Sequence, residues 1–251
     1  MEKTRQPLLS VITATYNAEK TISRLVDSLR AQSNQNFEWI VVDGGSTDAT
    51  LELVRQATDL SVQVSSQSDF GIYDALNRGI KLTRTPFYLV IGADDFFNPD
   101  AFAVIERAIT PDTQLLSGNV IVNGEVRRAK GKHNWLKGMT NFISAHSVGT
   151  VVRASLHQKY GLYSRLYPLA ADQAFIGKLA MENVPLTKVD AVLGSFSSEG
   201  ISSVDYLGSS TEFCRVQIDL GYSRVVQSLL CVVRILMFCV RSVSSASAGD
   251  K

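Results

Sequence analysis

Hydrophobic and polar positions divide the first half of the chain into two alternating kinds of segment. Short, nearly continuous apolar runs are typical of buried strands, whereas apolar residues three or four positions apart are typical of amphipathic helices. The predicted strands are residues 8–15, 39–42, 62–65 and 87–91, and the predicted helices are residues 18–30, 49–56 and 71–82. Strands that alternate with helices of this length indicate βαβ units and a mainly parallel sheet, so the predicted fold class is α/β.

Two asparagines stand where helices are expected to begin. Asn17 precedes the first helix, and Asn98 precedes Pro99 and Asp100, where a further helix is expected to open after the strand at 87–91. Asparagine is a favoured N-cap, and proline is a favoured first helical residue. The pattern therefore predicts both asparagines as N-caps.

The alternation ends after residue 109, and the second half of the chain has a mixed pattern. The expected strands there are 114–117, 120–122, 125–128, 149–153 and 186–195, and the expected helix is 172–181. Asn123-Gly124 favours a tight hairpin turn between two of these strands. We therefore expect one domain over residues 1–203, divided into a nucleotide-type half at 8–109 and a mixed half at 110–203. A helical segment with a polar tail follows at 204–251.

Length, charge and cysteine content bear on how the chain folds, what it binds and where it is located. A chain of 251 residues can bury roughly three quarters of its unfolded surface, so it needs no disulfide or metal to fold. The formal net charge of +1 gives no electrostatic argument for a nucleic-acid partner. The three cysteines lie near the C-terminus without framework spacing, which favours a reducing compartment. Because the polar N-terminus also lacks the pattern of a signal peptide, a cytoplasmic location is expected.

Two adjacent carboxylates, Asp94 and Asp95, directly follow the strand at 87–91. In open α/β sheets the ends of such strands form the ligand crevice. Gly92 and Ala93 are small enough to admit a ligand, and a pair of carboxylates suits a divalent cation that carries phosphates. The alternative is a pair of solvated loop acids next to the following helix.

The turn after the first strand, residues 13–17, contains no glycine. A dinucleotide fold needs glycines there, so that a pyrophosphate can approach the helix N-terminus. Asp43 ends the second strand, where it can accept hydrogen bonds from a ribose or a base; the alternative is an Asx turn ahead of a helix. A metal on Asp94 or Asp95 would neutralise the phosphates, so the residues favour a metal-dependent nucleotide site over a nicotinamide site.

Six motifs, taken together, resemble family-2 glycosyltransferases with the GT-A fold, and bacterial exopolysaccharide and O-antigen enzymes in particular. The motifs are Thr15-Tyr16-Asn17 and residues 41–48 (VVDGGSTD), 69–79 (DFGIYDALNRG), 92–95 (GADD), 160–163 (YGLY) and 170–173 (AADQ). The resemblance covers about residues 10–202, and the order and spacing of the motifs carry it. It implies a GT-A-like nucleotide-binding half at 8–109 and an acceptor half at 110–203.

The resemblance further implies inverting transfer of a sugar from a UDP- or GDP-sugar, with Mn2+ or Mg2+, to a lipid-linked surface glycan. The residues it assigns to the nucleotide sugar are Thr13, Thr15, Tyr16, Asp43, Asp69, Asn77, Arg78 and Asp94. Asp94 and Asp95 match the metal-binding acids, although Gly92 stands where the family often has the first acid. That departure leaves open which of the two binds the metal. Asp172 matches the general base; its alternative is a helix N-terminal acid stabilised by the macrodipole.

Candidate acceptor-side residues lie between 127 and 146. His146 stands where relatives often have His-Gln, and it can line the acceptor side or touch the diphosphate; a structural histidine is the alternative. Trp135 lies in a basic stretch that can meet the phosphates of a lipid-linked acceptor or a membrane surface. The basic residues are Arg127, Arg128, Lys130, Lys132, His133 and Lys137. A solvated hairpin and loop is the alternative there.

Residues 225–240 form a strongly apolar stretch that is too short for a bilayer span and has Arg234 midway. On a helix its few polar positions fall on one narrow stripe. They are Gln227, Ser228, Cys231 and Arg234, with Arg224 and Arg241 at the flanks. Three arrangements fit this pattern: a helix in a membrane interface, a contact in a homo-oligomer, and a core helix. We expect the first, with the arginines at the lipid headgroups on the inner face of the cell membrane.

Two rival functions have different requirements. A metal-dependent nucleotidyltransferase that makes nucleotide sugars would want a glycine-rich basic loop after the first strand, which this chain lacks. A catalytically inert membrane-associated scaffold would have no need of Asp43, Asp94, Asp95 and Asp172. Metal-dependent release of a nucleoside diphosphate separates an enzyme from such a scaffold.

Overall fold

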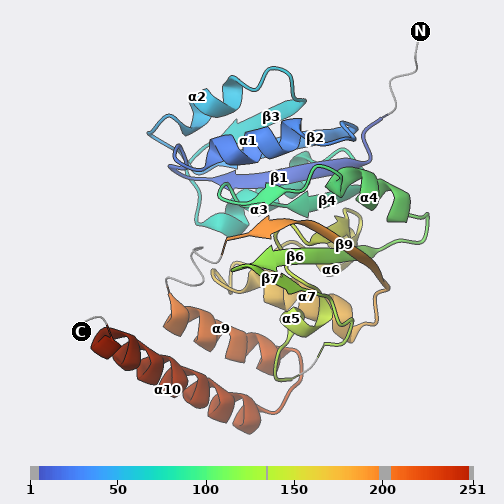
Figure 1. Cartoon of the computed structure of the whole chain (residues 1–251). Coiled ribbons are helices and arrows are strands. Elements are labelled where there is room, and N and C mark those ends of the chain that lie inside the picture. The colour runs from blue at the N-terminus through green and yellow to red at the C-terminus, as the bar shows by residue number, and fades with distance from the viewer. Residues whose placement is uncertain (1–5, 134, 198–204, 249–251) are drawn as a thin grey trace.

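The computed structural model describes residues 6–133, 135–197 and 205–248, with side chains as far as residue 240. The described strands form one sheet in the order β3-β2-β1-β4-β8-β6-β9-β5, with β7 paired to β6 (Figure 1). The strands are β1 Leu9–Thr15, β2 Phe37–Asp43, β3 Val62–Ser66, β4 Phe87–Val90, β5 Phe96–Phe97, β6 Leu115–Val122, β7 Glu125–Arg127, β8 Thr150–Arg153 and β9 Leu186–Phe196. β1 to β4 are mutually parallel, whereas β8 pairs antiparallel with both β4 and β6. The predicted α/β class with a mainly parallel first half is confirmed.

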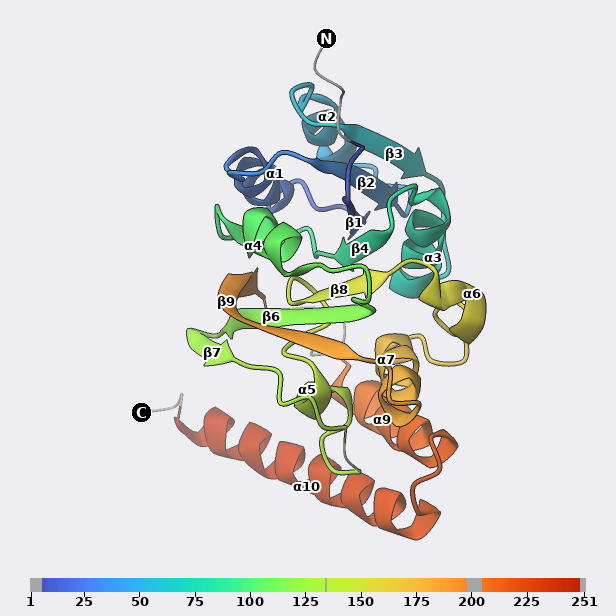
Figure 2. The same ribbon diagram turned by 90° about the vertical axis from the view of Figure 1, so that its right-hand side faces the viewer.

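Helices cover both faces of this sheet (Figure 2). They are α1 Ile22–Arg30, α2 Thr50–Arg55, α3 Ile72–Leu82, α4 Ala101–Ala108, α5 Met139–Phe142, α6 Leu156–Tyr160, α7 Ala171–Met181, α9 Tyr206–Asp219 and α10 Arg224–Ala248. Because successive strand residues point to opposite faces, the central strands supply two cores. Val11 and Val41 pack with α1, α2 and α4, and Ile12 and Val42 pack with α3, α6 and α7.

Both predicted asparagine N-caps are wrong. α1 begins only at Ile22, after the N-cap residue Thr21. Asn17 has a φ of 49°, and its side chain accepts a hydrogen bond from the Thr47 amide. α4 begins at Ala101, and the Asn98 side chain donates to the Val192 carbonyl. In each case the asparagine hydrogen-bonds the backbone of a distant segment, a partner that local sequence cannot reveal.

The hairpin around Asn123 and Gly124 is as predicted. β6 and β7 pair antiparallel across this turn, and both turn residues have positive φ, 51° and 79°. β6 is one strand over Leu115–Val122 rather than two, with an irregularity in its pairing to β9 near Asn119. The sequence pattern missed the short elements β5, α5 and α6, whereas α9 and α10 both lie in the expected helical segment at 204–251.

Gly194 in β9 holds β5, and thus the segment after Asp95, tightly against the sheet. A Cβ at residue 194 would overlap the Phe96 carbonyl oxygen and come within 2.9 Å of the Phe97 Cα. Both are backbone atoms of β5, so they cannot turn aside as a side chain can. We therefore expect Gly194→Ala to lower the free energy of unfolding by about 1–3 kcal/mol, the usual cost of overpacking.

Thermal unfolding measures this cost, since about 1 kcal/mol lowers the Tm of a domain this size by roughly 2–4 °C. Ser195→Ala is the matched control, because it adds no atom at the neighbouring position of β9. A Gly194→Ala variant that melts with the unchanged protein would show that β5 can move away from β9.

Candidate active site

A cavity of about 920 Å³ opens at the end of β4. Its wall includes Asp94, Asp95, His146 and Asp172, which come from the β4–β5 loop, the loop before β8 and the start of α7. Four residues predicted from distant parts of the sequence therefore border one space.

Asp95 is buried and already hydrogen-bonded. One carboxylate oxygen accepts from the Gly92 amide at 3.0 Å and from the Ser147 hydroxyl at 2.6 Å, and the other accepts from the Ser197 amide at 2.8 Å. Burial raises the pKa of Asp95, the charge of Asp94 adds to this, and the three hydrogen bonds oppose it. Asp95 thus ties the β4–β5 loop to the loop before β8 and to the end of β9.

Asp94 differs from Asp95 because no residue in the described ranges hydrogen-bonds its carboxylate, which borders the cavity. Both carboxylates fold back over Gly92. A Cβ at that position would lie 2.7 Å from Asp94 and 2.9 Å from Asp95. A side chain at residue 92 would therefore displace both carboxylates, and Asp94 is the carboxylate left available to a ligand.

The described residues contain no group of three or more His, Cys, Asp or Glu side chains that could hold a metal by themselves. Mg2+ commonly binds through one or two carboxylates, substrate phosphates and water. Asp94 fits such a site, because a carboxylate with no protein partner is a hard oxygen ligand facing open space. The remaining ligands would come from a bound phosphate and from water.

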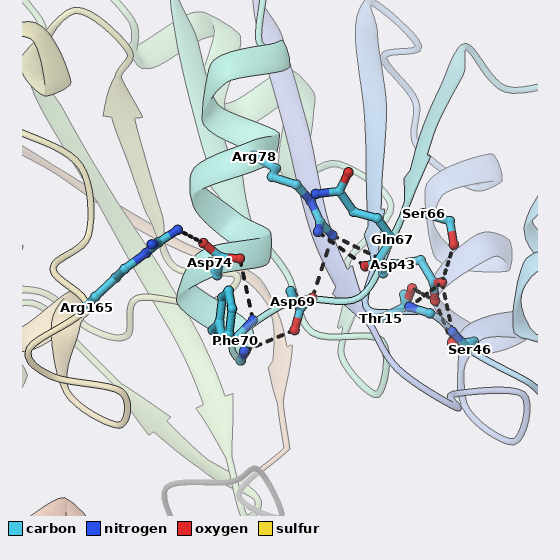
Figure 3. Close-up of polar contacts among 12 residues, drawn as sticks. Thr15, Asp43, Ser46, Ser66, Gln67, Asp69, Phe70, Asp74, Arg78 and Arg165 are labelled. Atoms are coloured by element: carbon cyan, nitrogen blue, oxygen red, sulfur yellow. Dashed lines mark hydrogen bonds and ion pairs between the residues drawn. The ribbon is translucent and has the colours of Figure 1, made fainter.

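Asp43 lies at the carboxyl end of β2, where its carboxylate accepts five hydrogen bonds (Figure 3). The donors are the amides of Gly45 and Ser46 and the hydroxyls of Thr15, Ser46 and Ser66. Burial acts to raise the pKa of Asp43, but these hydrogen bonds outweigh it and hold the pKa below its ordinary value. Asp43 thus forms the Asx-type turn that the sequence left open, and a nucleotide reaches the carboxylate only by replacing one of these donors.

Asp69 and Arg78 lie next to Asp43, as Figure 3 shows. Arg78 donates to the carbonyls of Asp43 and Gln67 and lies 3.6 Å from the Asp69 carboxylate. Its Nε is buried and has no partner among the described residues. Asp69 also accepts from the Gly71 amide, at the start of α3. The structure therefore brings Asp43, Asp69 and Arg78 together, although Asp43 and Arg78 are 35 residues apart in the sequence.

Three other predicted nucleotide residues have different surroundings. Thr13 is fully buried and accepts from the Trp39 indole at 3.0 Å. Asn77 is buried and makes two hydrogen bonds with the backbone of Tyr163, which fasten α3 to the loop between α6 and α7. Tyr16, in contrast, is largely exposed. Thr13 and Asn77 thus have their polar groups satisfied inside the protein.

Asp172 occupies the first turn of α7, where the helix dipole favours a negative charge. One carboxylate oxygen, Oδ1, accepts from the Tyr73 hydroxyl at 2.7 Å and from the Gln173 amide at 2.8 Å. The other, Oδ2, lies 3.9 Å from His146 Nδ1. Burial, and then the charge of Asp172, raise the pKa of Tyr73 well above its ordinary value, so this phenol stays a hydrogen-bond donor. Oδ2 is left as the oxygen with free acceptor capacity.

The expectation that Trp135 lines the site is not met. Trp135 is about half exposed and is not among the cavity residues, and its carbonyl accepts from Gln217 in α9 and Gln227 in α10. Five cations do line the cavity, namely Arg127, Arg128, Lys130, Lys137 and Arg234. Tyr73 is a functional candidate that the sequence did not single out, although it stands inside the 69–79 motif. Arg234, expected at the lipid headgroups, lines the cavity instead.

Comparisons with known proteins identify relatives and proteins of similar fold. A PGL/p-HBAD biosynthesis glycosyltransferase of Mycobacterium bovis is 30% identical over 175 residues, which cover 67% of this chain and 68% of the relative. A mannosyltransferase of Pyrobaculum calidifontis, solved with GDP-Man and Mn2+, is 15% identical and matches 98% of this chain and 80% of its own with a TM-score of 0.66.

S. aureus TarS is 19% identical and has a TM-score of 0.63 over 90% of this chain, which spans only 42% of TarS; a shorter form of TarS has been solved with UDP-GlcNAc. At these identities the solved structures establish the GT-A fold alone. The family model described as glycosyl transferase family 2 matches residues 10–165. That match covers more than half of the chain and includes Asp43, Asp69 and the Asp94-Asp95 pair, so the protein belongs to glycosyl transferase family 2.

Proposed function

We propose that this glycosyltransferase moves a sugar from a nucleoside-diphosphate sugar to an acceptor hydroxyl with inversion at the anomeric carbon. The observation that carries the proposal is the cavity shared by Asp94 and Asp172. Each of these residues keeps a carboxylate oxygen with no hydrogen bond from the described protein. One oxygen is available to a metal and the other to a proton.

Asp172 acts as the general base in this reaction. Its Oδ2 takes the proton of the acceptor hydroxyl while the hydroxyl oxygen forms a bond to the anomeric carbon. The bond from that carbon to the diphosphate breaks, and the nucleoside diphosphate leaves with the electron pair. A base on the face opposite the leaving group produces inversion.

Asp94 holds Mn2+ or Mg2+ in this proposal, because it is the free carboxylate of the pair. When bound, the metal offsets the negative charge that develops on the departing diphosphate. Asp95 orients Asp94 by fixing the β4–β5 loop through Gly92, Ser147 and Ser197.

The nucleoside lies against the group around Asp43, Asp69 and Arg78, with Thr15 and Tyr16 beside it. The largely exposed ring of Tyr16 and the buried, unpartnered Nε of Arg78 support this placement. Related solved structures hold UDP-GlcNAc and GDP-Man, which supports a UDP- or GDP-sugar as the donor.

The experiment that tests the function screens UDP-GlcNAc and GDP-mannose with and without Mn2+. We expect one of them to raise the Tm only when Mn2+ is present, and to release its nucleoside diphosphate. Binding without release under every metal condition would instead favour the inert scaffold.

The acceptor we propose is a lipid-linked glycan of a surface polysaccharide. The five cations of the cavity wall support this, because Arg and Lys side chains can hold a phosphate that joins sugar and lipid. Arg234 is one of the residues that line the cavity, so a ligand there meets its positive charge.

α10 supports a membrane contact through residues 225–240. Its polar stripe faces the protein, because Gln227 donates to the Trp135 carbonyl, Cys231 to the Ser210 carbonyl and Arg234 to the Leu136 carbonyl. Most of its apolar side chains are exposed instead. They are Val225, Val226, Leu229, Val232, Val233, Leu236, Met237, Phe238 and Val240. The core-helix alternative is therefore wrong.

The expectation that Arg234 lies at the lipid headgroups is also wrong, because its guanidinium stacks over the Phe213 ring and binds the domain. Within the described ranges no helix has both the length and the hydropathy to cross a bilayer. Figures 1 and 2 place α10 at the end of the molecule farthest from α2 and β3. We propose that this apolar face lies on the membrane, on its cytoplasmic side, with the cavity above it.

Replacing Leu229 and Leu236 together by glutamate tests the membrane contact. Both side chains are exposed, so the fold should survive. Each leucine contributes roughly 1.5 kcal/mol or more when it enters an apolar phase, so the double variant should bind liposomes about 100-fold more weakly. Co-sedimentation with phosphatidylglycerol-containing vesicles measures this.

Leu166→Glu is the control, because it changes an equally exposed leucine outside α10. Equal liposome binding by the double variant would remove α10 from the membrane contact. Loss of a dimer in gel filtration, with no liposome binding by either form, would assign the apolar face to a homo-oligomer.

A further inference from the structure

A buried chain of aromatic and histidine side chains runs from Asp172 into the domain. His146 Nε2 lies 2.6 Å from the Tyr163 hydroxyl, which lies 3.2 Å from the Tyr88 hydroxyl. The Tyr88 hydroxyl lies 2.6 Å from His157 Nε2, and His157 Nδ1 lies 2.8 Å from the Gly161 carbonyl oxygen. Nothing in the proposed reaction so far uses this chain.

The far end of the chain fixes where each proton lies. A carbonyl oxygen only accepts, so His157 Nδ1 carries a proton and donates to Gly161. Burial lowers the pKa of His157, so the ring is neutral and its Nε2 is bare. The Tyr88 hydroxyl must therefore donate to His157. Because a hydroxyl has one proton, Tyr88 cannot donate a second hydrogen bond.

The same reasoning continues toward Asp172. Because the Tyr88 proton is already used in the hydrogen bond to His157, the contact between Tyr88 and Tyr163 is a hydrogen bond only if Tyr163 is the donor. Tyr163 then has no proton left, so its contact with His146 requires a proton on His146 Nε2. Burial lowers the pKa of His146 even though the charge of Asp172 opposes this, so His146 is neutral and its Nδ1 is bare.

The gap between His146 and Asp172 agrees with this assignment. Nδ1 and the Asp172 Oδ2 are 3.9 Å apart, about 1 Å longer than a hydrogen bond. A protonated Nδ1 facing the half-buried Asp172 carboxylate would approach to hydrogen-bond distance. Two bare acceptors repel each other and stay apart, as these two atoms do.

We propose that His146 is a positioning residue for Asp172, held by the Tyr163–Tyr88–His157 chain in the one tautomer that presents a bare Nδ1 to the base. The inference rests on the proposed role of Asp172. When Oδ2 takes the proton of the acceptor hydroxyl, the new O–H faces an acceptor, and a shift of about 1 Å closes a hydrogen bond that exists only after proton transfer. The product side of the proton transfer is thereby favoured over the resting carboxylate. The chain ends on a carbonyl, so it orients His146 and does not conduct the proton onward.

The first test reads the tautomers directly by NMR of the full chain labelled with 15N-histidine. The protein has three histidines, so the signals can be assigned with single substitutions. We expect the proton of His146 on Nε2 and that of His157 on Nδ1. In Tyr88→Phe the Tyr163 proton is free to turn to His146, so His146 should change to the Nδ1–H form. Tyr160→Phe, at a half-buried tyrosine that lies outside the chain and contacts Lys159, should change neither ring.

An Nδ1–H form of His146 in the unchanged protein would overturn the proposal. The NMR measurement does not depend on enzyme activity. It therefore tests the tautomer of His146 even if neither donor is hydrolysed and the proposed function is wrong.

The second test compares two substitutions of His146. His146→Gln keeps a polar atom near Nε2, where it can still bind Tyr163, but leaves nothing at Nδ1. His146→Asn places an amide near Nδ1 and gives up the contact with Tyr163. With Mn2+ and UDP-GlcNAc or GDP-mannose, and water as acceptor, we expect a roughly tenfold lower kcat for the glutamine variant, from one lost hydrogen bond. The asparagine variant should retain more activity, and the KM for the donor should not change in either.

A merely structural His146 predicts the opposite order, because only glutamine preserves the contact with Tyr163. Higher kcat for His146→Gln than for His146→Asn would therefore overturn the proposal.

Discussion

Asp172→Asn is expected to bind the nucleotide sugar normally and to lose transfer, with a fall in kcat on the order of 10²–10⁴. The amide keeps the size of the side chain, and its carbonyl oxygen can still accept from Tyr73 and from the Gln173 amide at the positions where Oδ1 does now. The NH2 group then replaces Oδ2 and cannot take a proton from the acceptor hydroxyl.

Single-turnover kinetics with a saturating donor separate the chemical step from binding. Tyr73→Phe is the matched control, because it removes a hydrogen bond to the same carboxylate but leaves the base in place. We expect a much smaller loss from it. A variant Asp172→Asn that loses nucleotide affinity and keeps its rate at saturation would mean that Asp172 binds the donor rather than the acceptor.

Asp94→Ala is expected to have the second largest effect, a fall in kcat/KM of on the order of 10²–10³. Charge neutralisation by a metal is worth several kcal/mol to the leaving diphosphate, and about 1.4 kcal/mol corresponds to a factor of ten. The fold should not suffer, since no described residue donates to Asp94. Stabilisation by UDP should no longer depend on Mn2+.

Asp95→Ala separates the two acids of the pair. It removes the acceptor of three hydrogen bonds from buried or half-buried donors, and each donor left unsatisfied costs about 1–3 kcal/mol. Its Tm should fall by several degrees, whereas the Tm of Asp94→Ala should not. Unchanged Mn2+ dependence in Asp94→Ala would remove Asp94 from the metal site.

The nucleotide half could be predicted from sequence because its elements are local. Continuous apolar runs and helical spacing place β1 to β4 and α1 to α3 within a few residues, and a strand end is enough to locate Asp94 and Asp95. The roles of individual side chains depend on distant partners instead. Ser66 lies 23 residues from Asp43 and uses part of its carboxylate, and Tyr73 lies 99 residues from Asp172.

The direction in which α10 faces is a second property that the sequence does not contain. Helical spacing predicts one polar stripe and one apolar face, and this is correct. Which of the two meets the protein depends on the acceptors offered by the domain. The carbonyls of Trp135 and Leu136 bind the polar stripe, so the apolar face turns outward.

α3 has a consequence for the design of chimeric enzymes. This one helix carries Tyr73, which binds Asp172, Asn77, which fastens to Tyr163, and Arg78, which contacts Asp43 and lies beside Asp69. Five residues of helix, or about 7.5 Å, separate Tyr73, which contacts the proposed general base, from Arg78, which contacts the proposed nucleoside site. A crossover near residue 109 would take α3 from one parent enzyme and its contacts Tyr163 and Asp172 from the other. The two halves would then be positioned by contacts that did not evolve together. Exchange of acceptor specificity between relatives should therefore transfer α3 together with residues 160–173 as one inherited unit.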